Sequence, residues 1–302
     1  VLIEILACAV CRTDLHVQDA ELPDVHYPVV PGHQVVGNVV ATGPDSVLEP
    51  GQRVGVAWLA WTCGECEFCA SGRENLCDRA QFHGYHRDGG YAEHMLADSR
   101  YCIPLDRSLD PVKTTPLLCA GLIGFRTLRM AGEGRRIGMY GFGSAAHVIA
   151  QVARHQGRDV YAFTRPGDQP AQAFAREIGA CWAGDSDEPA PEPLDAALIF
   201  APVGALVPKA LRDIKKGAPV VCGGIHMSDI PSFPYADLWG ERELRSVANL
   251  TRQDGHDFMA LAARTPIETH VTEYALSDAN RALDDLRTGR LTGTAVLVTG
   301  RG

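Results

Sequence analysis

The stretch Arg136-Ile137-Gly138-Met139-Tyr140-Gly141-Phe142-Gly143-Ser144-Ala145-Ala146-His147 has the pattern of a short strand, a glycine turn and the start of a helix. The apolar residues of 145–152 recur at i, i+3, i+4 and i+7, which predicts one buried helix face. In the turn, Gly141, Gly143 and Ala146 let the backbone approach a pyrophosphate, which the N-terminus of the following helix then stabilises. The stretch therefore predicts a dinucleotide-binding turn.

The segments after this turn supply its context, because a glycine pattern alone is weak evidence. They predict strands at 159–163, 196–200 and 219–222 and helices at 169–178 and 205–214. Strands that alternate with helices predict an α/β fold with a doubly wound parallel sheet, the Rossmann arrangement. The alternative is an α/β domain whose glycines serve only the turn.

The preferred dinucleotide depends on the end of the second strand, where NAD-specific sites usually place Asp or Glu against the ribose 2′-hydroxyl. This chain has Thr164 and Arg165 there. Threonine is neutral and arginine can form paired hydrogen bonds to a phosphate, so the sequence favours NADP over NAD. The alternative is that Arg165 is merely solvated at the strand end.

Four cysteines, Cys63, Cys66, Cys69 and Cys77, form the pattern Cys-x2-Cys-x2-Cys-x7-Cys. This spacing suits four thiolates that close a tetrahedron around one zinc ion. The segment lacks the apolar periodicity that would hold a loop by packing, so a metal would replace the missing core. A disulfide knot, an iron–sulfur cluster and unpaired buried thiols are the alternatives. The pattern favours a closed structural zinc site.

A third cluster lies near the start of the chain, where Cys8 and Cys11 precede His16 and, further on, His33. Cysteine and histidine from separate segments can bind zinc through three protein ligands and leave a fourth position for water or substrate. On spacing alone the interpretation is weak, because a lone Cys or His is more often packed or solvated. Cys8 and Cys11 could also form a redox Cys-x-x-Cys pair.

The composition indicates a globular protein that does not bind nucleic acid. The 302 residues suffice for about two domains, and 46% hydrophobic with 22% charged residues exclude a disordered or fibrous chain. A net charge of −9 without a Lys/Arg run argues against a nucleic-acid surface. The longest apolar run, 117–125, is too short to span a bilayer, and no charged leader precedes an apolar segment. We therefore expect a cytoplasmic protein without a membrane partner.

Taken in order, these motifs resemble a known family. The segment 11–16, the Gly32-His33 pair, the four-cysteine segment and the Gly141 turn occur as they do in zinc-dependent medium-chain alcohol dehydrogenases, and the resemblance covers essentially the whole chain. It implies a GroES-like, β-rich catalytic domain from residues 1–118 and 265–302, with a structural zinc lobe at 63–77. It also implies an inserted Rossmann domain at 119–264 and a homo-oligomer, either a dimer or a tetramer.

The resemblance also assigns metal ligands. It implies that Cys11, His33 and Cys119 bind a catalytic zinc ion, and that Cys8 is a packed strand cysteine rather than a redox partner. Gln34 follows the ligand histidine where the family commonly has an acidic residue.

The resemblance further implies roles for the residues near that zinc. Arg12 would contact the cofactor pyrophosphate, Thr13 would relay the alcohol proton, and His16 would form the solvent end of the relay. Asp14 would support His33, and Trp58 would line the substrate pocket.

The resemblance completes the cofactor site with two loops that flank the nicotinamide, at 201–203 and 223–225. Val203, Gly223 and Gly224 are the cofactor-binding residues expected there. Thr294 stands where many members of the family carry a basic residue.

The resemblance implies the chemistry as well. A zinc ion on two thiolates and one imidazole lowers the pKa of an alcohol, so that hydride can pass to nicotinamide, and the reverse reaction reduces a carbonyl. We expect an alcohol dehydrogenase or aldehyde reductase with two zinc ions per chain and NAD(P), NADP being favoured, acting on a small alcohol or aldehyde. A zinc-free quinone or enone reductase and a non-catalytic zinc-binding interaction protein are the alternatives.

Overall fold

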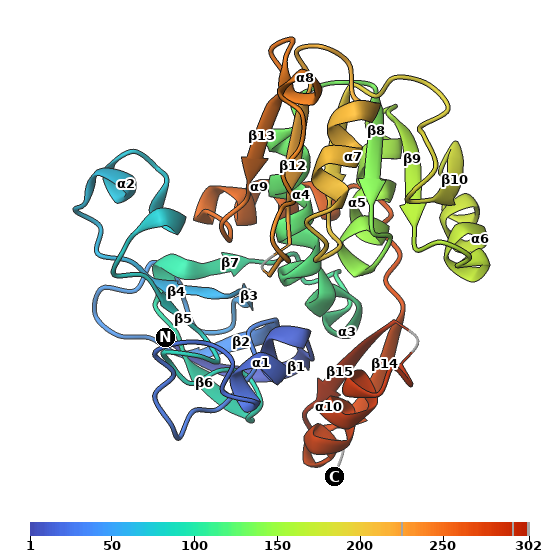
Figure 1. The fold of residues 1–302 in the computed structure, drawn as a ribbon. Coiled ribbons are helices and arrows are strands. Elements are labelled where there is room, and N and C mark those ends of the chain that lie inside the picture. The colour runs from blue at the N-terminus through green and yellow to red at the C-terminus, as the bar shows by residue number, and fades with distance from the viewer. Residues whose placement is uncertain (225, 292, 301–302) are drawn as a thin grey trace. The chain divides into compact units, whose positions relative to one another are not determined.

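A computed structural model describes residues 1–224, 226–291 and 293–300, which form two compact units (Figure 1). Unit 1 comprises residues 1–122 and 249–302, and unit 2 comprises residues 123–248. The two units differ in their sheets: strands of unit 1 are mostly antiparallel, and those of unit 2 are all parallel.

The second boundary differs from the expected one, because residues 249–264 pack in unit 1. They contain helix α9 (Arg252–Ala262), whose Phe258 is fully buried. An added Cβ at Gly121 would lie 2.5 Å from the Phe258 ring, and one at Gly255 would lie 2.7 Å from Ile103. Both contacts require glycine, and they anchor α9 to residues of unit 1.

Unit 1 contains nine strands and five helices in its described part. The strands are β1 (Leu2–Ala9), β2 (Val35–Ala41), β3 (Arg53–Val56), β4 (Leu59–Trp61), β5 (Gln81–Phe82), β6 (His94–Leu96), β7 (Cys102–Pro104), β14 (Val271–Ala275) and β15 (Thr294–Val298). The helices are α1 (Arg12–Gln18), α2 (Glu67–Ala70), α3 (Pro111–Thr114), α9 and α10 (Ala279–Arg287). Short 3-10 turns lie at Glu74–Leu76, Ser99–Tyr101, Thr115–Leu118 and Leu276–Asp278.

The main sheet of unit 1 joins the two ends of the chain. Its order is β14-β15-β1-β2-β3-β7, with β6 also paired to β1. Ala7 of β1 lies opposite Val298 of β15, so the segments before and after the inserted unit share one sheet. Residues of β1, β2 and β3, such as Ile3, Val35 and Val54, bury their side chains together and form its core.

Unit 2 is a parallel sheet with helices on both faces. Its strands are β8 (Arg136–Tyr140), β9 (Asp159–Thr164), β10 (Trp182–Asp185), β11 (Ala196–Ile199), β12 (Pro219–Cys222) and β13 (Glu243–Ser246). Its helices are α5 (Ser144–His155), α6 (Gln169–Glu177), α7 (Leu206–Asp213) and α8 (Tyr235–Leu238), and α4 (Ala120–Met130) leads into it. The order β10-β9-β8-β11-β12-β13 reverses direction between β8 and β11.

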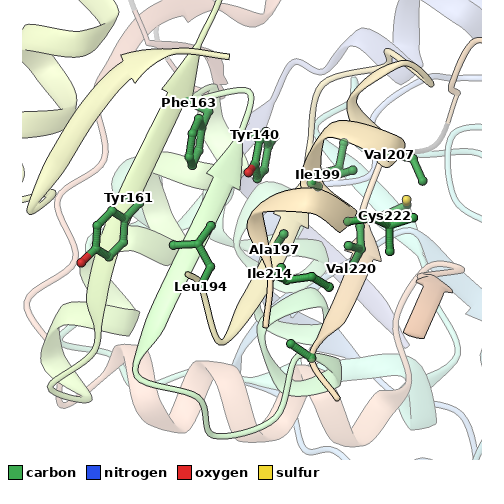
Figure 2. Packing of buried hydrophobic residues seen from close by; sticks show 13 residues of the cluster. Tyr140, Tyr161, Phe163, Leu194, Ala197, Ile199, Val207, Ile214, Val220 and Cys222 are labelled. Carbon is green, nitrogen blue, oxygen red and sulfur yellow. The ribbon is translucent and has the colours of Figure 1, made fainter. Parts of the chain in front are cut away.

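The core of unit 2 explains why this sheet forms. Tyr140 and Phe163 stack with ring centroids 4.2 Å apart, and both are fully buried (Figure 2). They share a cluster with Ile199 and with Val207 of α7, whereas Ala162 packs with Ala175 of α6. Alternate residues of β9 thus face opposite sides of the sheet, so α7 and α6 cover opposite faces.

The predicted elements of unit 2 are present, with boundaries shifted by a few residues, and two strands were not predicted. The missed strands are β10, which contains a glycine, and β13, an exposed edge strand of mainly polar residues. Neither shows the apolar run or the alternation that marks a strand in a sequence.

The helices are short throughout. The longest in the described ranges is α5, with 12 residues, followed by α4 and α9 with 11 each. In these ranges none of them combines the length and the apolar character needed to cross a bilayer.

Candidate functional site

The four cysteines of the lobe form a cluster with the dimensions of a metal site. The sulfurs of Cys63, Cys66, Cys69 and Cys77 all lie within 4.8 Å of one another. Cys63 Sγ is 3.8 Å from Cys69 Sγ and 3.5 Å from Cys77 Sγ. Four sulfurs about 2.3 Å from a central zinc ion would lie about 3.8 Å apart, whereas a disulfide requires about 2.05 Å. All four cysteines are free thiols, and the donor set fits a tetrahedral zinc ion.

The backbone around Cys63 prepares it for this role. The N–H groups of Glu65 and Cys66 point at the sulfur and lower the pKa of Cys63 to about 6. A thiol that ionises near neutral pH is a ready metal ligand, because the thiolate is the ligating form. The turns that wrap the cluster are held by local backbone contacts such as Ala70 N to Cys66 O, at 2.9 Å.

A second cluster joins three segments of unit 1 that are distant in sequence. The ligand atoms of Cys11, His33 and Cys119 lie within 4.8 Å of one another. Cys11 precedes α1, His33 precedes β2, and Cys119 lies between a 3-10 turn and α4. Two sulfurs and one imidazole fit a zinc ion with three protein ligands and one open position. The structure thus brings together the three residues predicted from the resemblance.

The Asp14 carboxylate contacts the segments that carry Cys11 and His33. Its Oδ2 accepts hydrogen bonds from Cys11 N at 2.8 Å and Tyr91 Oη at 3.2 Å, and its Oδ1 accepts one from Gly32 N at 3.1 Å. Oδ1 also lies 3.3 Å from His33 Nδ1, with both side chains buried. A carboxylate on Nδ1 leaves Nε2 for a metal, as is usual for ligand histidines.

Gly32 is required beside His33. Its φ is +100°, and an added Cβ would lie 2.5 Å from the Tyr91 ring and 2.8 Å from Cys8 Sγ.

Burial of Cys8 in the core of the main sheet agrees with a packed strand cysteine. Gln34 is also buried, and its carbonyl accepts a hydrogen bond from Ala9 N at 3.0 Å.

Charge is concentrated at the three-ligand cluster. Hydrogen bonds from Cys119 and His33 to the Cys11 sulfur hold the pKa of that thiol well below its usual range, despite its burial. Burial opposes a charge on His33, but Asp14 and Cys11 raise its pKa to about 10. The protein therefore stabilises an ionised Cys11, which is the form that binds metal.

The predicted relay residues lie on α1 beside the cluster. Thr13 is buried, with its hydroxyl oxygen 3.7 Å from Cys11 Sγ. His16 lies one turn further along, partly exposed, and its Nδ1 contacts Glu21. Arg12 is exposed at the start of the same helix. One helix thus carries a hydroxyl near the metal ligands and an imidazole near solvent.

Trp58 lies against the ligand histidine. Its ring contacts His33 edge-on with centroids 4.9 Å apart, and it stacks on Phe82 at 5.2 Å and on Tyr85 at 5.7 Å. The Phe82 and Tyr85 centroids are 6.3 Å from each other, so the three rings form one aromatic cluster. This packing places Trp58 beside the candidate ligand His33.

The glycine turn of unit 2 leads into a helix without a side-chain cap. Gly141 has φ of +90°, and an added Cβ would lie 2.7 Å from Ala201. Gly143 is the N-cap of α5 and supplies no side-chain cap, and no acidic residue lies in the first turn. Nothing lies within 4 Å of a Cβ placed on Gly143, and Ala146 is fully buried. Uncapped N–H groups at an open helix N-terminus suit a pyrophosphate.

The predicted nicotinamide loops end on the same edge of this sheet. Ile199 of β11 is in register with Tyr140 of β8 and with Cys222 of β12. The residues that follow these strands, Gly141, Val203 and Gly223 among them, therefore leave the sheet at one edge, next to the point where the strand order reverses. Parallel α/β sheets bind their ligands at such a point.

The described loops differ in exposure. Val203 is exposed and Gly224 half-buried, whereas Ile225 lies outside the described residues.

Thr294 belongs to unit 1, where its N–H donates to His270 O at 2.8 Å.

The loop that carries Arg165 is fixed by Asp185. Asp185 Oδ1 accepts hydrogen bonds from Gly167 N at 3.0 Å and from Gln172 Nε2 at 2.7 Å. Thr164 is buried, and its hydroxyl lies 3.3 Å from the Gly184 carbonyl of the next strand. Arg165 is exposed. Of the two cofactor-binding residues predicted at this strand end, Arg165 is the one with an accessible side chain.

Several residues around the candidate sites could not be identified from the sequence. They include Tyr91, which holds Asp14, and Phe82 and Tyr85, which support Trp58. Tyr91 is 77 positions from Asp14, and no local pattern links the two.

Comparison with known proteins identifies the family of the chain. Residues 1–107 match the family model described as the alcohol dehydrogenase GroES-like domain. The chain is 43% identical over 306 residues to the probable alcohol dehydrogenase AdhA of Mycobacterium tuberculosis, an alignment that covers 98% of this chain and 88% of the relative.

Two solved structures illustrate the fold. A cobalt- and zinc-bound thermostable alcohol dehydrogenase from Pyrobaculum aerophilum superposes with a TM-score of 0.86 at 22% identity, covering 99% of this chain and 91% of that one. The enzyme CAD from Helicobacter pylori, complexed with NADP(H), gives 0.85 at 22% identity, covering 99% and 90%. The predicted fold class, a GroES-like β-rich domain with an inserted Rossmann domain, is confirmed.

Proposed function

Because the chain belongs to the zinc-type medium-chain alcohol dehydrogenase family, we propose that it transfers hydride between a small alcohol or carbonyl compound and NAD(P) with the help of zinc. The observation that carries the proposal is the convergence of Cys11, His33 and Cys119 from three segments beside the Thr13 hydroxyl. The lobe cysteines would hold a second, structural zinc ion, so we propose two zinc ions per chain.

The residues at the three-ligand cluster would divide the work. Zinc and nicotinamide would supply Lewis acidity and a hydride acceptor. Thr13 would take the proton that the alcohol releases, and His16 would pass it to solvent. Asp14 would fix the orientation of His33, and Trp58 would form one wall for the substrate. The donor set supports zinc at the three-ligand cluster, and a solved structure that shares the fold is zinc-bound.

For the cofactor we propose a preference for NADP. Arg165 is an exposed cation on a loop that Asp185 fixes, at the end of the second strand. A guanidinium can form paired hydrogen bonds to a 2′-phosphate. Residues 163–166 of the strand end include no acidic side chain, whereas NAD-specific sites usually place one there. The NADP(H) complex of the Helicobacter pylori structure shows that the fold accommodates this cofactor.

Metal analysis together with a substrate panel tests the proposal. We expect two zinc ions per chain and saturable oxidation of alcohols and reduction of aldehydes, with NADP(H) more efficient than NAD(H). One zinc ion per chain, with reduction of quinones or enones but not of aldehydes, would instead indicate a zinc-free reductase. Absence of nicotinamide binding would indicate a non-catalytic zinc protein.

We also propose that the chain forms a homo-oligomer through strand β13. Its four residues are exposed, and in the described part of the sheet it pairs only with β12. An antiparallel contact between two copies, centred on Leu244, would place Glu243 of each copy opposite Arg245 of the other. The segment before β13 exposes Tyr235 and Trp239, which suits burial in an interface.

Light scattering tests this interface. Leu244→Asp would place like charges opposite each other at the centre of the contact, so we expect the mass of a single chain. The matched control is Val47→Asp, because Val47 is an exposed apolar residue of unit 1. A multimeric mass for Leu244→Asp, equal to that of the control, would contradict the proposed interface.

A further inference from the structure

A buried pair of hydroxyl groups lies directly behind the cysteine lobe. Thr62 precedes the first lobe cysteine, and Tyr101 belongs to a separate 3-10 turn; both are buried. The Thr62 backbone N–H donates to Tyr101 Oη at 3.0 Å, and the two hydroxyl oxygens are 2.6 Å apart. Thr62 Oγ1 is also 3.4 Å from Cys69 Sγ. The Thr62 N–H, the two hydroxyls and the Cys69 sulfur thus form one hydrogen-bonded series that ends on a sulfur of the lobe.

Counting protons shows which direction of hydrogen bonding these groups favour. Each hydroxyl can donate one proton. If Cys69 donates its S–H to Thr62, then Thr62 donates to Tyr101, and the Tyr101 hydroxyl has no acceptor among these groups. If the sulfur only accepts, Tyr101 donates to Thr62, Thr62 donates to Cys69, and every donor is used. A buried donor without an acceptor is costly, so the second arrangement is favoured.

The second arrangement is the one that a metal site requires, because a metal-bound cysteine sulfur carries no proton and can only accept. The Tyr101 ring is held in position by Arg252, whose guanidinium lies 5.2 Å from the ring centre. Arg252 in turn donates to the buried Glu74 from N at 2.9 Å and from Nε at 3.1 Å. Glu74 is three positions before Cys77, so the lobe and its support are tied together at two points.

We propose that Thr62 and Tyr101 are positioning residues that stabilise the metal-bound form of Cys69 and thereby increase the affinity of the lobe for metal. The inference rests on the proposed zinc occupancy of the lobe. It adds an O–H donor to the sulfur ligand, and hydrogen bonds of this kind behind metal ligands commonly change metal affinity by about 10–100-fold.

The test uses the full chain with Cys11→Ala, which removes a ligand of the other metal cluster, so that the lobe dominates metal binding. Thr62→Val and Tyr101→Phe each remove one hydroxyl and keep the shape of the side chain. In competition with a chromophoric chelator, we expect each to release zinc about tenfold more readily. Thr62→Ser keeps the donor and should retain the parent affinity. Thr265→Val is the matched control, because Thr265 is buried but its hydroxyl has no partner.

Cobalt substitution separates this role from a general loss of stability. Loss of the O–H donor makes the sulfur more electron-rich, so the sulfur-to-cobalt charge-transfer band of Thr62→Val should move to longer wavelength. A merely structural role would lower the melting temperature without moving the band.

The outcomes distinguish the inference from the proposed function. Unchanged zinc affinity and an unchanged band in both Thr62→Val and Tyr101→Phe would overturn the hydroxyl-pair role while leaving the metal site intact. A parent lobe that binds neither zinc nor cobalt would overturn the metal site itself and, with it, this inference. If Thr62→Val does not fold, the shift in metal affinity of Tyr101→Phe decides the matter.

Discussion

Replacing Cys66 with serine should unfold the lobe locally. Of the apolar side chains in 63–77, Cys77 is buried, Phe68 is half-buried and Leu76 is exposed. Complete burial of one large apolar side chain contributes about 1.5–3 kcal/mol, so packing stabilises the lobe by a few kcal/mol at most. Zinc binding contributes about 10–16 kcal/mol in small zinc modules, which makes it the dominant favourable contribution.

Hydrogen exchange and metal analysis measure this effect. We expect Cys66→Ser to lose one zinc ion per chain and the amides of the lobe to exchange almost as fast as in an unfolded peptide. The amides of β1 and β2 should stay protected, because they pair within the main sheet. Cys181→Ser is the control, since Cys181 is an exposed cysteine of unit 2. Undiminished zinc content and protected lobe amides in Cys66→Ser would refute the reasoning.

Three further predictions concern the cofactor, the proton relay and pH. Arg165→Ala should weaken NADPH binding by about 1.5–3 kcal/mol and NADH binding much less; equal losses would show that Arg165 does not contact the 2′-phosphate. Thr13→Val should slow alcohol oxidation by about 10²-fold. His16→Gln should slow it less, and mostly at low pH, because water can replace the partly exposed His16 imidazole. Unchanged pH–rate profiles in both variants would exclude the relay. Burial opposes ionisation of Glu74, but hydrogen bonds from Arg252 hold the pKa of Glu74 below its usual value. The ion pair therefore stabilises the fold fully above about pH 4.3, the pKa of an unperturbed Glu. This stabilisation is lost as the pH falls through the pKa of the folded state. Glu74→Gln should therefore melt below the parent protein at pH 7, and melting curves should converge in acid; a gap that widens in acid would contradict this.

The features that could be predicted from the sequence are local ones. The spacing of the lobe cysteines and the Gly141 turn each place their functional groups within about fifteen residues, so local geometry largely determines the site. The apolar face of α5 was predicted for the same reason, and Val148, Ile149 and Val152 are buried as expected. Cys11, His33 and Cys119 are dispersed in the sequence, and only the family resemblance indicated that they would meet.

What could not be predicted depends on contacts between distant positions. Tyr101 is 39 positions from Thr62, and nothing in either segment indicates that the two hydroxyls pair. Strand β13 forms because its backbone continues the parallel sheet next to β12, although its side chains show no strand pattern. The return of residues 249–264 to unit 1 depends on Phe258 packing against Gly121, a contact that spans the whole inserted unit.

The most direct test of the proposed chemistry is the rate of NAD(P)-linked alcohol oxidation in Cys11→Ala. This change opens the three-ligand cluster but leaves the lobe cysteines and the Gly141 turn unchanged. We predict that turnover is abolished on every alcohol and aldehyde that the parent protein accepts, while one zinc ion per chain and nicotinamide binding remain. Parent-like rates in Cys11→Ala would contradict zinc-assisted hydride transfer and would indicate a zinc-free reductase.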